Sequence, residues 1–381
     1  MFDAADMGHM QQALALAEKG LWTTTPNPRV GCVLVREGQV VGEGWHAKAG
    51  GPHAEVVALQ QAAERARGAT AFITLEPCAH IGRTGPCTEA LIRAGVAMVV
   101  VATEDPNPRV SGRGLARLRE AGLGVRVGLL SEQAQALNVG FFKRMRTGLP
   151  WIRIKSAASL DGRTALANGQ SKWITDAACR ADGHAWRARS CAVLTGAGTF
   201  AQDQPLLNVR EVPTDRQPMR VLLDGRLVAD PDAPFFRLPG AVLLTGAALD
   251  APAAADRLAR LQARGCKVVQ LPADDDGANG RRLNLRVVCE WLAEQGCNEV
   301  QVEAGARLTG AFLAHGLVDE WLLYQAPVVL GEGRGLAEPM AALAQPSDAP
   351  RWRVHDLARL GDGIRLVMRA PRTLDVAPTS P

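Results

Sequence analysis

The sequence predicts two α/β domains, on three observations. Apolar segments of strand length alternate with segments of helical periodicity along most of the chain. A chain of 381 residues is too long for one ordinary hydrophobic core. The short break Thr147-Gly148-Leu149-Pro150 separates two such alternating patterns. We therefore expect one domain over 1–146, a second over 150–370, and a disordered tail rich in Pro, Thr and Ala over 371–381.

The first domain opens with a helix over residues 3–19, which ends at Gly20. A hairpin follows, in which strands 30–35 and 40–45 flank the turn Glu37-Gly38. The remaining elements are expected in this order: a helix from His53 to about Arg67, strand 71–75, a helix from Cys87, strand 98–102, helix 113–121, a short strand near Val125 and helix 132–146. This order predicts a three-layer α/β/α domain, with helices on both faces of one sheet.

The second domain begins with a strand over 151–157. Further strands are expected at 192–194, 221–223, 241–244, 267–271 and 300–303, and helices at 176–189, 253–264, 285–295 and 306–314. Two last strands, 352–357 and 364–368, close the domain. The alternation is typical of nucleotide-binding α/β domains.

Composition narrows the classes of protein to consider. No apolar run is long enough to cross a bilayer, and the acidic residues Asp3 and Asp6 replace the basic start of a secretory signal, so we expect a cytoplasmic protein without a membrane partner. Eight dispersed cysteines do not form the framework of a disulfide-stabilised domain. A net charge of +4, spread among acidic residues, and 4% aromatic residues argue against a nucleic-acid partner.

The motif His53-Ala54-Glu55, followed by Pro77-Cys78 and by Cys87, predicts a zinc site. One imidazole and two thiolates are three zinc ligands, which leave a fourth position open for water. Glu55, beside the ligands but outside the set, is expected to carry protons as the catalytic residue. This combination is typical of zinc-dependent hydrolytic deaminases.

The spacing departs from the short deaminase pattern, because eight residues separate Cys78 from Cys87. Glycines and a proline in this segment can turn the chain back, so that both sulfurs reach one ion. His80 lies in the same segment and is an alternative ligand, although Cys87 is favoured because it opens a helix after Pro86. The ordinary alternative is that the cysteines are buried thiols and His53 caps a helix.

The segment Pro26-Asn27-Pro28-Arg29-Val30 recurs as residues 106–110. The repeat is either two coincidental turns, which Asn-Pro steps commonly form, or two polar loops that border one pocket.

Across essentially its full length, the chain closely resembles the bifunctional riboflavin biosynthesis deaminase/reductases. The motifs that carry the resemblance are Thr25-Pro26-Asn27-Pro28, Val30-Gly31-Cys32-Val33, Gly51-Pro52-His53-Ala54-Glu55, Thr74-Leu75-Glu76-Pro77-Cys78, Gly82-Arg83-Thr84, Pro86-Cys87, Asp105-Pro106-Asn107-Pro108, Gly112-Arg113-Gly114, Ala158-Ser159-Leu160-Asp161-Gly162-Arg163 and Val302-Glu303-Ala304-Gly305. The resemblance implies a cytidine-deaminase-like domain followed by a dihydrofolate-reductase-like domain. It also accounts for the long segment between the two cysteines.

By this resemblance, the first domain deaminates diaminohydroxyphosphoribosylaminopyrimidine with one Zn²⁺ per chain. The second reduces the ribosyl group of the resulting aminouracil to ribityl with NADPH. The expected partner is therefore a small phosphorylated pyrimidine, and we expect the chain to form a homo-oligomer.

The resemblance also implies binding residues in both domains. The deaminase substrate positions are Asn27, His46, Arg83 and Asn107. The NADPH positions are Ala157, Trp173, Thr199, Asp203 and Gly305. The reductase substrate positions are Ser171, Arg187, Leu207, Arg210 and Glu303. Guanidinium groups bind phosphate in a bidentate manner, which fits Arg187 and Arg210.

Two short loops at predicted strand ends, 195–199 and 303–307, are candidates for binding cofactor phosphates through backbone N–H groups, although neither matches the dinucleotide fingerprint. Two alternatives stay open for Lys155 and Asp161: a functional role, or only a structural ion pair with each other. Two other functions share some of these features: a deaminase of tRNA or single-stranded nucleic acid, and a non-enzymatic zinc domain fused to a nucleotide sensor.

Overall fold

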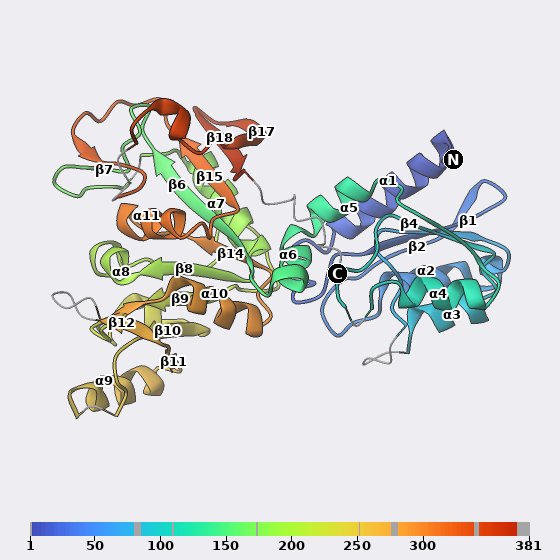
Figure 1. The fold of residues 1–381 in the computed structure, drawn as a ribbon, viewed down its shortest axis with the longest axis horizontal. Coiled ribbons are helices and arrows are strands. Elements are labelled where there is room, and N and C mark those ends of the chain that lie inside the picture. The colour runs from blue at the N-terminus through green and yellow to red at the C-terminus, as the bar shows by residue number, and fades with distance from the viewer. Residues whose placement is uncertain are drawn as a thin grey trace. The chain divides into compact units, whose positions relative to one another are not determined.

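The computed structural model describes residues 2–79, 85–108, 110–172, 174–250, 252–275, 281–338 and 343–371. The chain separates into two compact units, Met1–Leu149 and Pro150–Pro381, which are coloured blue to teal and green to red in Figure 1. Of the tail expected over 371–381, residues 372–381 lie outside the described residues. Each unit is described by itself below.

The first unit contains a five-stranded sheet in the order β2-β1-β3-β4-β5. Its strands are β1 (Gly31–Arg36), β2 (Gln39–Trp45), β3 (Thr70–Ile73), β4 (Met98–Val101) and β5 (Gly124–Val127). The pairs β2–β1 and β1–β3 are antiparallel, whereas β3–β4 and β4–β5 are parallel. The register pairs Gly31 with Trp45 and Cys32 with Ile73, so the segments after β2 and β3 and the segment before β1 meet at one sheet edge.

Helices cover both faces of this sheet (Figure 1). On one face, α1 (Ala4–Glu18) and α5 (Ser131–Leu137) bury Met10 and Ala134 with Val33 and Phe72 of the sheet. On the other, α2 (Ala54–Ala62), α3 (Cys87–Arg93) and α4 (Arg113–Glu120) form a second apolar core. The predicted three-layer α/β/α architecture is confirmed.

Two glycines set how closely the helices approach the sheet. A Cβ atom at Gly31 would lie 1.9 Å from the carbonyl oxygen of Ala13 in α1. A Cβ atom at Gly44 would lie 2.3 Å from the carbonyl oxygen of Ala54, the first residue of α2. Only glycine allows these contacts, and the second of them fixes where α2 begins relative to the end of β2.

The structure divides two of the expected helices. The helix from His53 ends at Ala62 and continues as the 3₁₀ turn η1 (Ala63–Ala66). The helix expected over 132–146 is α5 and α6 (Val139–Thr147), with Asn138 between them. The Asn138 side chain accepts a hydrogen bond from the Arg29 N–H and donates one to the Arg29 carbonyl, at 2.8 and 2.9 Å. An asparagine that binds backbone outside its own helix competes with helix continuation.

The second unit contains a nine-stranded sheet in the order β11-β10-β9-β8-β14-β6-β15-β18-β17. The strands are β6 (Trp151–Ala158), β8 (Ala192–Gly196), β9 (Met219–Leu223), β10 (Ala241–Thr245), β11 (Lys267–Gln270), β14 (Glu299–Val302), β15 (Glu320–Gln325), β17 (Arg353–Leu360) and β18 (Gly363–Arg369). Neighbours from β11 to β15 are parallel, and β18 and β17 are antiparallel additions. Parallel order brings the carboxyl ends of β8, β14 and β6 together.

The helices of the second unit are α7 (Ala177–Arg189), α8 (Ala197–Asp203), α9 (Pro252–Ala263), α10 (Leu285–Glu294) and α11 (Ala306–Ala314). Two ribbons, β7 (Ala165–Leu166) with β16 (Gly333–Arg334) and β12 (Ala273–Asp275) with β13 (Arg281–Leu283), and the 3₁₀ turns η2 (Pro234–Arg237) and η3 (Pro346–Asp348) complete it. The sequence did not predict β15, α8 or the ribbons. The α/β class of this unit is confirmed.

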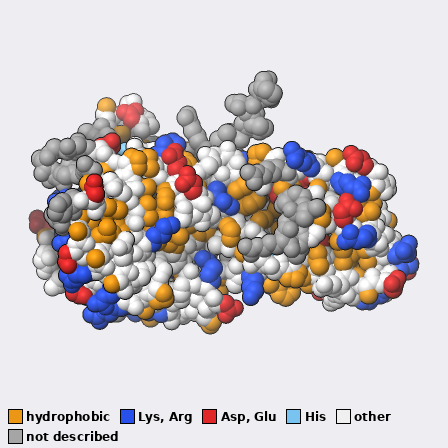
Figure 2. Space-filling model, turned by 90° about the horizontal axis from the view of Figure 1, so that it is seen from below, with side chains coloured by type: hydrophobic (Ala, Val, Ile, Leu, Met, Phe, Trp, Pro, Cys, Tyr) orange, Lys and Arg blue, Asp and Glu red, His pale blue; other side chains and the backbone are white. Residues whose placement is uncertain are grey.

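The surface carries mixed charge. On the face that Figure 2 shows, Lys and Arg side chains are scattered among Asp and Glu side chains and orange apolar groups. None of the helices in the described part of the chain has the length and apolar character that a bilayer crossing requires.

A buried charge cluster joins the central strands of the second unit. Arg153 on β6 is fully buried and forms ion pairs with Glu320 on β15 and Glu299 on β14, at 2.5 and 3.1 Å. Arg189 pairs with Glu299 at 2.7 Å, and Arg369 lies 3.5 Å from Glu320. Because two carboxylates here are shielded from water, the cluster needs its central cation.

We expect Arg153→Leu to lower the free energy of unfolding of the second unit by about 3 kcal/mol or more, because it leaves buried carboxylates undercompensated. Denaturant-induced unfolding followed by Trp fluorescence measures this loss. The matched control is Arg264→Leu, which breaks an exposed pair with Asp232 and should cost about 0.5 kcal/mol or less. Equal effects of the two substitutions would contradict the prediction.

Candidate functional site

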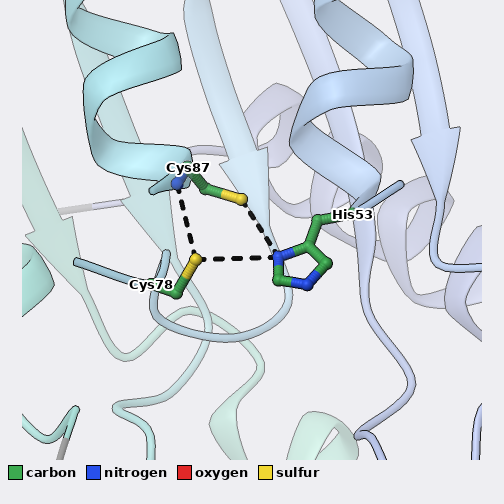
Figure 3. Close-up of side chains that lie close together, drawn as sticks. All are labelled: His53, Cys78 and Cys87. Carbon is green, nitrogen blue, oxygen red and sulfur yellow. Dashed lines mark hydrogen bonds between the residues drawn. The ribbon is translucent and has the colours of Figure 1, made fainter. Parts of the chain in front are cut away.

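His53, Cys78 and Cys87 meet at the sheet edge described above, as Figure 3 shows. His53 is the N-terminal cap of α2, and Cys87 is the first residue of α3. Cys78 lies in the loop after β3. Pro86 precedes the helix at the position where a missing N–H costs nothing, which places Cys87 in the first turn.

The three side chains point their ligand atoms toward one another. The His53 Nδ1 atom lies 3.2 Å from Cys87 Sγ and 3.6 Å from Cys78 Sγ. The backbone N–H of Cys87 donates to Cys78 Sγ at 3.4 Å. Within the described part of the chain, His53, Cys78 and Cys87 are the one group of at least three His, Cys, Asp or Glu side chains whose ligand atoms all lie within 4.8 Å of one another.

The donor set fits zinc. One imidazole nitrogen and two thiolate sulfurs are the soft ligands that Zn²⁺ prefers, and they leave one tetrahedral position for a non-protein ligand. Hydrogen bonds from Cys87, together with His53, lower the pKa of the Cys78 thiol to about 4, so that its ligating thiolate form prevails at neutral pH. His80, the alternative ligand, lies outside the described residues.

Glu55 lies beside the three ligands without belonging to the group. It sits in the first turn of α2 and is only 3% exposed. Burial, with the charge of Cys78, raises the pKa of its carboxyl group. A carboxyl group with a raised pKa, close to a metal site, can both accept and return a proton.

Asn27 and His46 are brought together at the same edge. The Asn27 Nδ2 and His46 Nε2 atoms are 3.0 Å apart, and His46 Nδ1 lies 3.0 Å from the Pro52 carbonyl oxygen. Because a carbonyl can only accept, Nδ1 carries the proton and Nε2 accepts from the Asn27 amide. Burial lowers the pKa of His46, which keeps this neutral form. The hydrogen bond to His46 thus uses the Asn27 amide nitrogen and not its carbonyl oxygen.

Asn107 lies in the loop after β4, and its backbone N–H donates to Asp105 Oδ1 at 2.8 Å. The first Pro-Asn-Pro segment therefore precedes β1 and the second follows β4, which places both at the sheet edge where His53, Cys78 and Cys87 meet. Arg83 and Arg109 lie outside the described residues, so the structure gives no position for them.

In the second unit, several of the expected cofactor and substrate residues lie at the carboxyl ends of neighbouring parallel strands. Ala157 is near the end of β6, Glu303 follows β14, and Thr199 lies in α8 directly after β8. The N–H of Gly305, which caps α11, donates to Thr199 Oγ1 at 2.9 Å. The two candidate phosphate loops are thus joined by a hydrogen bond.

Three other expected positions lie in loops or at a helix end. Asp203 is exposed at the end of α8, and Ser171 is partly buried before α7. Leu207 is buried and has a positive φ of 53°. Trp173 lies outside the described residues.

Known protein families match both parts of the chain. Residues 4–103 match the cytidine and deoxycytidylate deaminase zinc-binding region, and residues 150–366 match the RibD C-terminal domain. The second match alone spans more than half of the chain. The chain belongs to the RibD family. It is therefore a bifunctional enzyme of riboflavin biosynthesis, with a zinc-dependent deaminase domain and an NADPH-dependent reductase domain.

Relatives match over nearly their whole length. The riboflavin biosynthesis protein RibD of Haemophilus influenzae is 45% identical, with 96% of this chain and 97% of the relative aligned. The RibD protein of Escherichia coli is 44% identical, over 95% of this chain and 98% of its own. The solved structure of Acinetobacter baumannii RibD, form 1, is 42% identical with a TM-score of 0.86, covering 97% of this chain and 99% of that one.

A third solved structure, from Thermotoga maritima, is described as a diaminohydroxyphosphoribosylaminopyrimidine deaminase/5-amino-6-(5-phosphoribosylamino)uracil reductase. It is 32% identical with a TM-score of 0.82, over 96% of this chain and 99% of that one. The expected family and the expectation of an enzyme are confirmed.

Arg187 differs from its expected arrangement. Its Nε and Nη2 atoms donate to the two oxygens of Glu303, at 2.6 and 2.8 Å, and its Nη1 atom donates to the Asn208 carbonyl. Burial opposes ionisation of Glu303, but Arg187 and then Lys155 lower the pKa of that carboxyl group to about 2. The two guanidinium N–H groups of Arg187 that were expected to bind a phosphate instead bind Glu303. The two side chains meet because Arg187 lies near the end of α7 and Glu303 directly follows β14.

Lys155 and Asp161 do not form the ion pair considered from the sequence. Asp161 accepts hydrogen bonds from Ser159 Oγ and from the N–H groups of Leu330 and Gly331, at 2.6, 3.0 and 2.8 Å. The Lys155 Nζ atom instead lies 5.5 Å from the centre of the Tyr324 ring. Burial lowers the pKa of Lys155, and the neighbouring Glu303 opposes that effect.

His184 was not expected from the sequence. It lies on α7, is 4% exposed, and its Nδ1 atom accepts the backbone N–H of Arg210 at 3.2 Å. Burial, together with the charges of Arg187 and Arg210, lowers the pKa of His184 to about 4. For a lone histidine in a helix, no sequence signal distinguishes a hydrogen bond to a distant backbone N–H from ordinary core packing.

The lowered pKa of His184 predicts a pH dependence of stability. As pH falls below the ordinary value of 6.5, the ring protonates in the unfolded chain but stays neutral in the fold until about pH 4. The unfolded state then binds more protons, so stability decreases as pH falls between these values. His184→Asn keeps an acceptor for the Arg210 N–H and should lack this component. Denaturant unfolding of both proteins at pH steps across that range measures the difference; parallel curves would contradict it.

Proposed function

We propose that the first domain deaminates diaminohydroxyphosphoribosylaminopyrimidine and that the second reduces 5-amino-6-(5-phosphoribosylamino)uracil with NADPH. The description of the Thermotoga maritima relative supports these substrates. The observation that carries the deaminase proposal is the position of Glu55, buried beside the three metal ligands but outside their set.

In this reaction, His53, Cys78 and Cys87 hold zinc, which when bound lowers the pKa of water and so supplies a nucleophile at neutral pH. Glu55 would accept one proton from the attacking water and deliver it to a nitrogen of the pyrimidine ring. It would then accept the second proton from the new hydroxyl group on the ring carbon and pass it to the amino group, which leaves as ammonia when the C–N bond breaks and the carbonyl forms. Its raised pKa suits both directions of transfer.

Polar side chains at the same edge would orient the pyrimidine and its ribosyl phosphate. Because Asn27 donates to His46, its carbonyl oxygen is directed to accept a hydrogen bond from the substrate. Asn107, in the loop after β4, is proposed as a second polar group that orients the ring, and Arg83 is proposed as a phosphate ligand, both by family resemblance.

We expect Glu55→Gln to lower the rate of ammonia release by about 10²–10⁴-fold, because it removes the proton carrier. Zinc content by elemental analysis should stay unchanged, and NADPH oxidation with the aminouracil substrate should persist in the same protein. Cys87→Ser is the contrasting variant and should lose zinc, whereas Cys266→Ser, which alters a buried thiol of the other unit, should keep it. Unchanged ammonia release in Glu55→Gln would contradict the assigned role.

For the reductase domain, the N-terminus of α11 and the start of α8 are proposed to hold the cofactor through Gly305 and Thr199. Ala157, Trp173 and Asp203 complete the proposed contacts. Backbone N–H groups at a helix N-terminus favour phosphate. NADPH, when bound, supplies the hydride, and the protein positions the ribosyl carbon against it.

The substrate would bind beside the carboxyl ends of β14 and β6, near Glu303, Arg187, Ser171 and Leu207. Among the two arginines, Arg210 suits the phosphate better than Arg187. Its side chain is 49% exposed, and its guanidinium contacts Asn208 Oδ1 at 3.4 Å and Glu211 at 4.0 Å, which are weak interactions. Arg187 would then act by fixing Glu303.

We expect Arg210→Ala to raise the KM of the phosphorylated aminouracil roughly 10- to 100-fold, because a charge-assisted contact contributes about 1.5–3 kcal/mol. The KM of the dephosphorylated analogue and that of NADPH should change little. Steady-state NADPH oxidation measures all three. Arg237→Ala, on an exposed turn, is the control. An equal rise for both pyrimidines would exclude a phosphate contact.

We further propose that the partner is a small molecule and not a nucleic acid, which the scattered charges on the face in Figure 2 support. A homo-oligomeric state and a cytoplasmic location stay predictions.

A further inference from the structure

Glu76 is a buried carboxylate that the chemistry above does not use. It precedes Pro77-Cys78, is 4% exposed, and accepts four backbone N–H groups. Its Oε2 atom accepts from Asp105 and Gly112, at 3.2 and 3.0 Å. Its Oε1 atom accepts from Gly114 and Leu115, at 2.8 and 3.3 Å. A carboxylate in which both oxygens bind backbone is held in one place.

The four donors enclose the loop that carries Asn107. Asp105 and Gly112 stand at the two ends of that loop, and Gly114 and Leu115 lie in the first turn of α4. One side chain therefore fixes both where the loop leaves the sheet and where it enters the helix. Inside the loop, the Val110 and Ser111 N–H groups donate to the Asn107 carbonyl, which makes it a compact turn.

The backbone of α4 also lies directly against the segment that carries Cys78. A Cβ atom at Gly114 would be 2.1 Å from the Pro77 carbonyl oxygen and 3.1 Å from Glu76 Oε1. The contact leaves no room for a side chain, so the loop cannot shift relative to this metal ligand without breaking the bonds to Glu76.

We propose that Glu76 is a positioning residue for deamination: through backbone hydrogen bonds to both ends of the 105–112 loop, it sets the place of Asn107 relative to the zinc ligands. This inference rests on the deaminase function proposed above. Glu76 is outside the group of metal ligands and acts on the substrate only through the loop.

The chemistry requires a carboxylate of this length. All four partners are donors, and an ionised carboxylate is the side chain that accepts at both oxygens without presenting a donor. Glu76→Gln puts an amide N–H₂ against two backbone N–H groups. Glu76→Asp keeps the charge but withdraws it by one methylene.

Glu76→Gln tests the proposal in the full-length enzyme. We expect the kcat/KM for ammonia release to fall roughly 10- to 100-fold, mainly through KM, because misplaced binding groups weaken substrate orientation. Zinc content and the kcat of the reductase reaction should be unchanged. Amide hydrogen exchange should accelerate at residues 105–115 and stay slow in α2. The control Glu89→Gln alters a glutamate in α3 that pairs with Arg117, and should change none of these quantities.

A double-variant cycle separates positioning from general destabilisation. If Glu76 acts through the loop, Asn107→Ala and Glu76→Gln should each raise KM, and the double variant should show little further increase. Additive increases, or loss of zinc together with faster exchange throughout the domain, would overturn the proposal. Should Glu76→Gln not fold, Glu76→Asp carries the same measurements, with a smaller effect expected. A wild-type enzyme without ammonia release would refute the deaminase function itself, whereas unchanged kinetics in an active Glu76→Gln enzyme would refute only this inference.

Discussion

The deaminase domain depends on the convergence, at one sheet edge, of three side chains that we propose to bind zinc. His53 and Cys87 stand at the starts of two helices, and Cys78 lies in the loop that follows the strand between them. None of these groups has a reason to be close in an unfolded chain. The antiparallel pairing of β1 with β2 and β3 brings their segments together, and Gly44 in β2 lets α2 approach the sheet closely. The geometry of the metal site is therefore set by the packing of the helices on the sheet.

The candidate site of the reductase domain differs from that of the deaminase domain, because it consists of charged side chains and not of metal ligands. Glu303 and Arg187 neutralise one another near the end of β14, and the partly buried Lys155 lies nearby. A second cluster around Arg153 lies within the strands themselves. Buried ion pairs contribute little net stability, but each fixes the position of long side chains that would otherwise adopt many rotamers. The Glu303–Arg187 pair lies at the carboxyl end of β14, whereas the Arg153 cluster joins β6, β14 and β15 at their amino ends.

Much of the fold and of the zinc site could be predicted from the sequence. Periodicity gave most strands and helices, and the motif around His53 and Cys78 identifies zinc chemistry because few other functions need those residue types together. Strand β15 was missed because Asp319 and Glu320 resemble a polar loop, whereas in the fold Glu320 is buried against Arg153. The division at Asn138 was missed since it depends on Arg29, which is distant in the sequence. Likewise, the pairing of Arg187 with Glu303 joins residues more than a hundred positions apart, and no local pattern records it.

The two units follow one another without an intervening segment, since Leu149 ends the first and Pro150 begins the second. Every ribosome that completes this chain delivers one copy of each catalyst. The cell thus obtains both activities in equal number from a single message, and neither can be over-produced relative to the other. Any imbalance in flux between the successive reactions must arise from turnover rates and not from gene dosage.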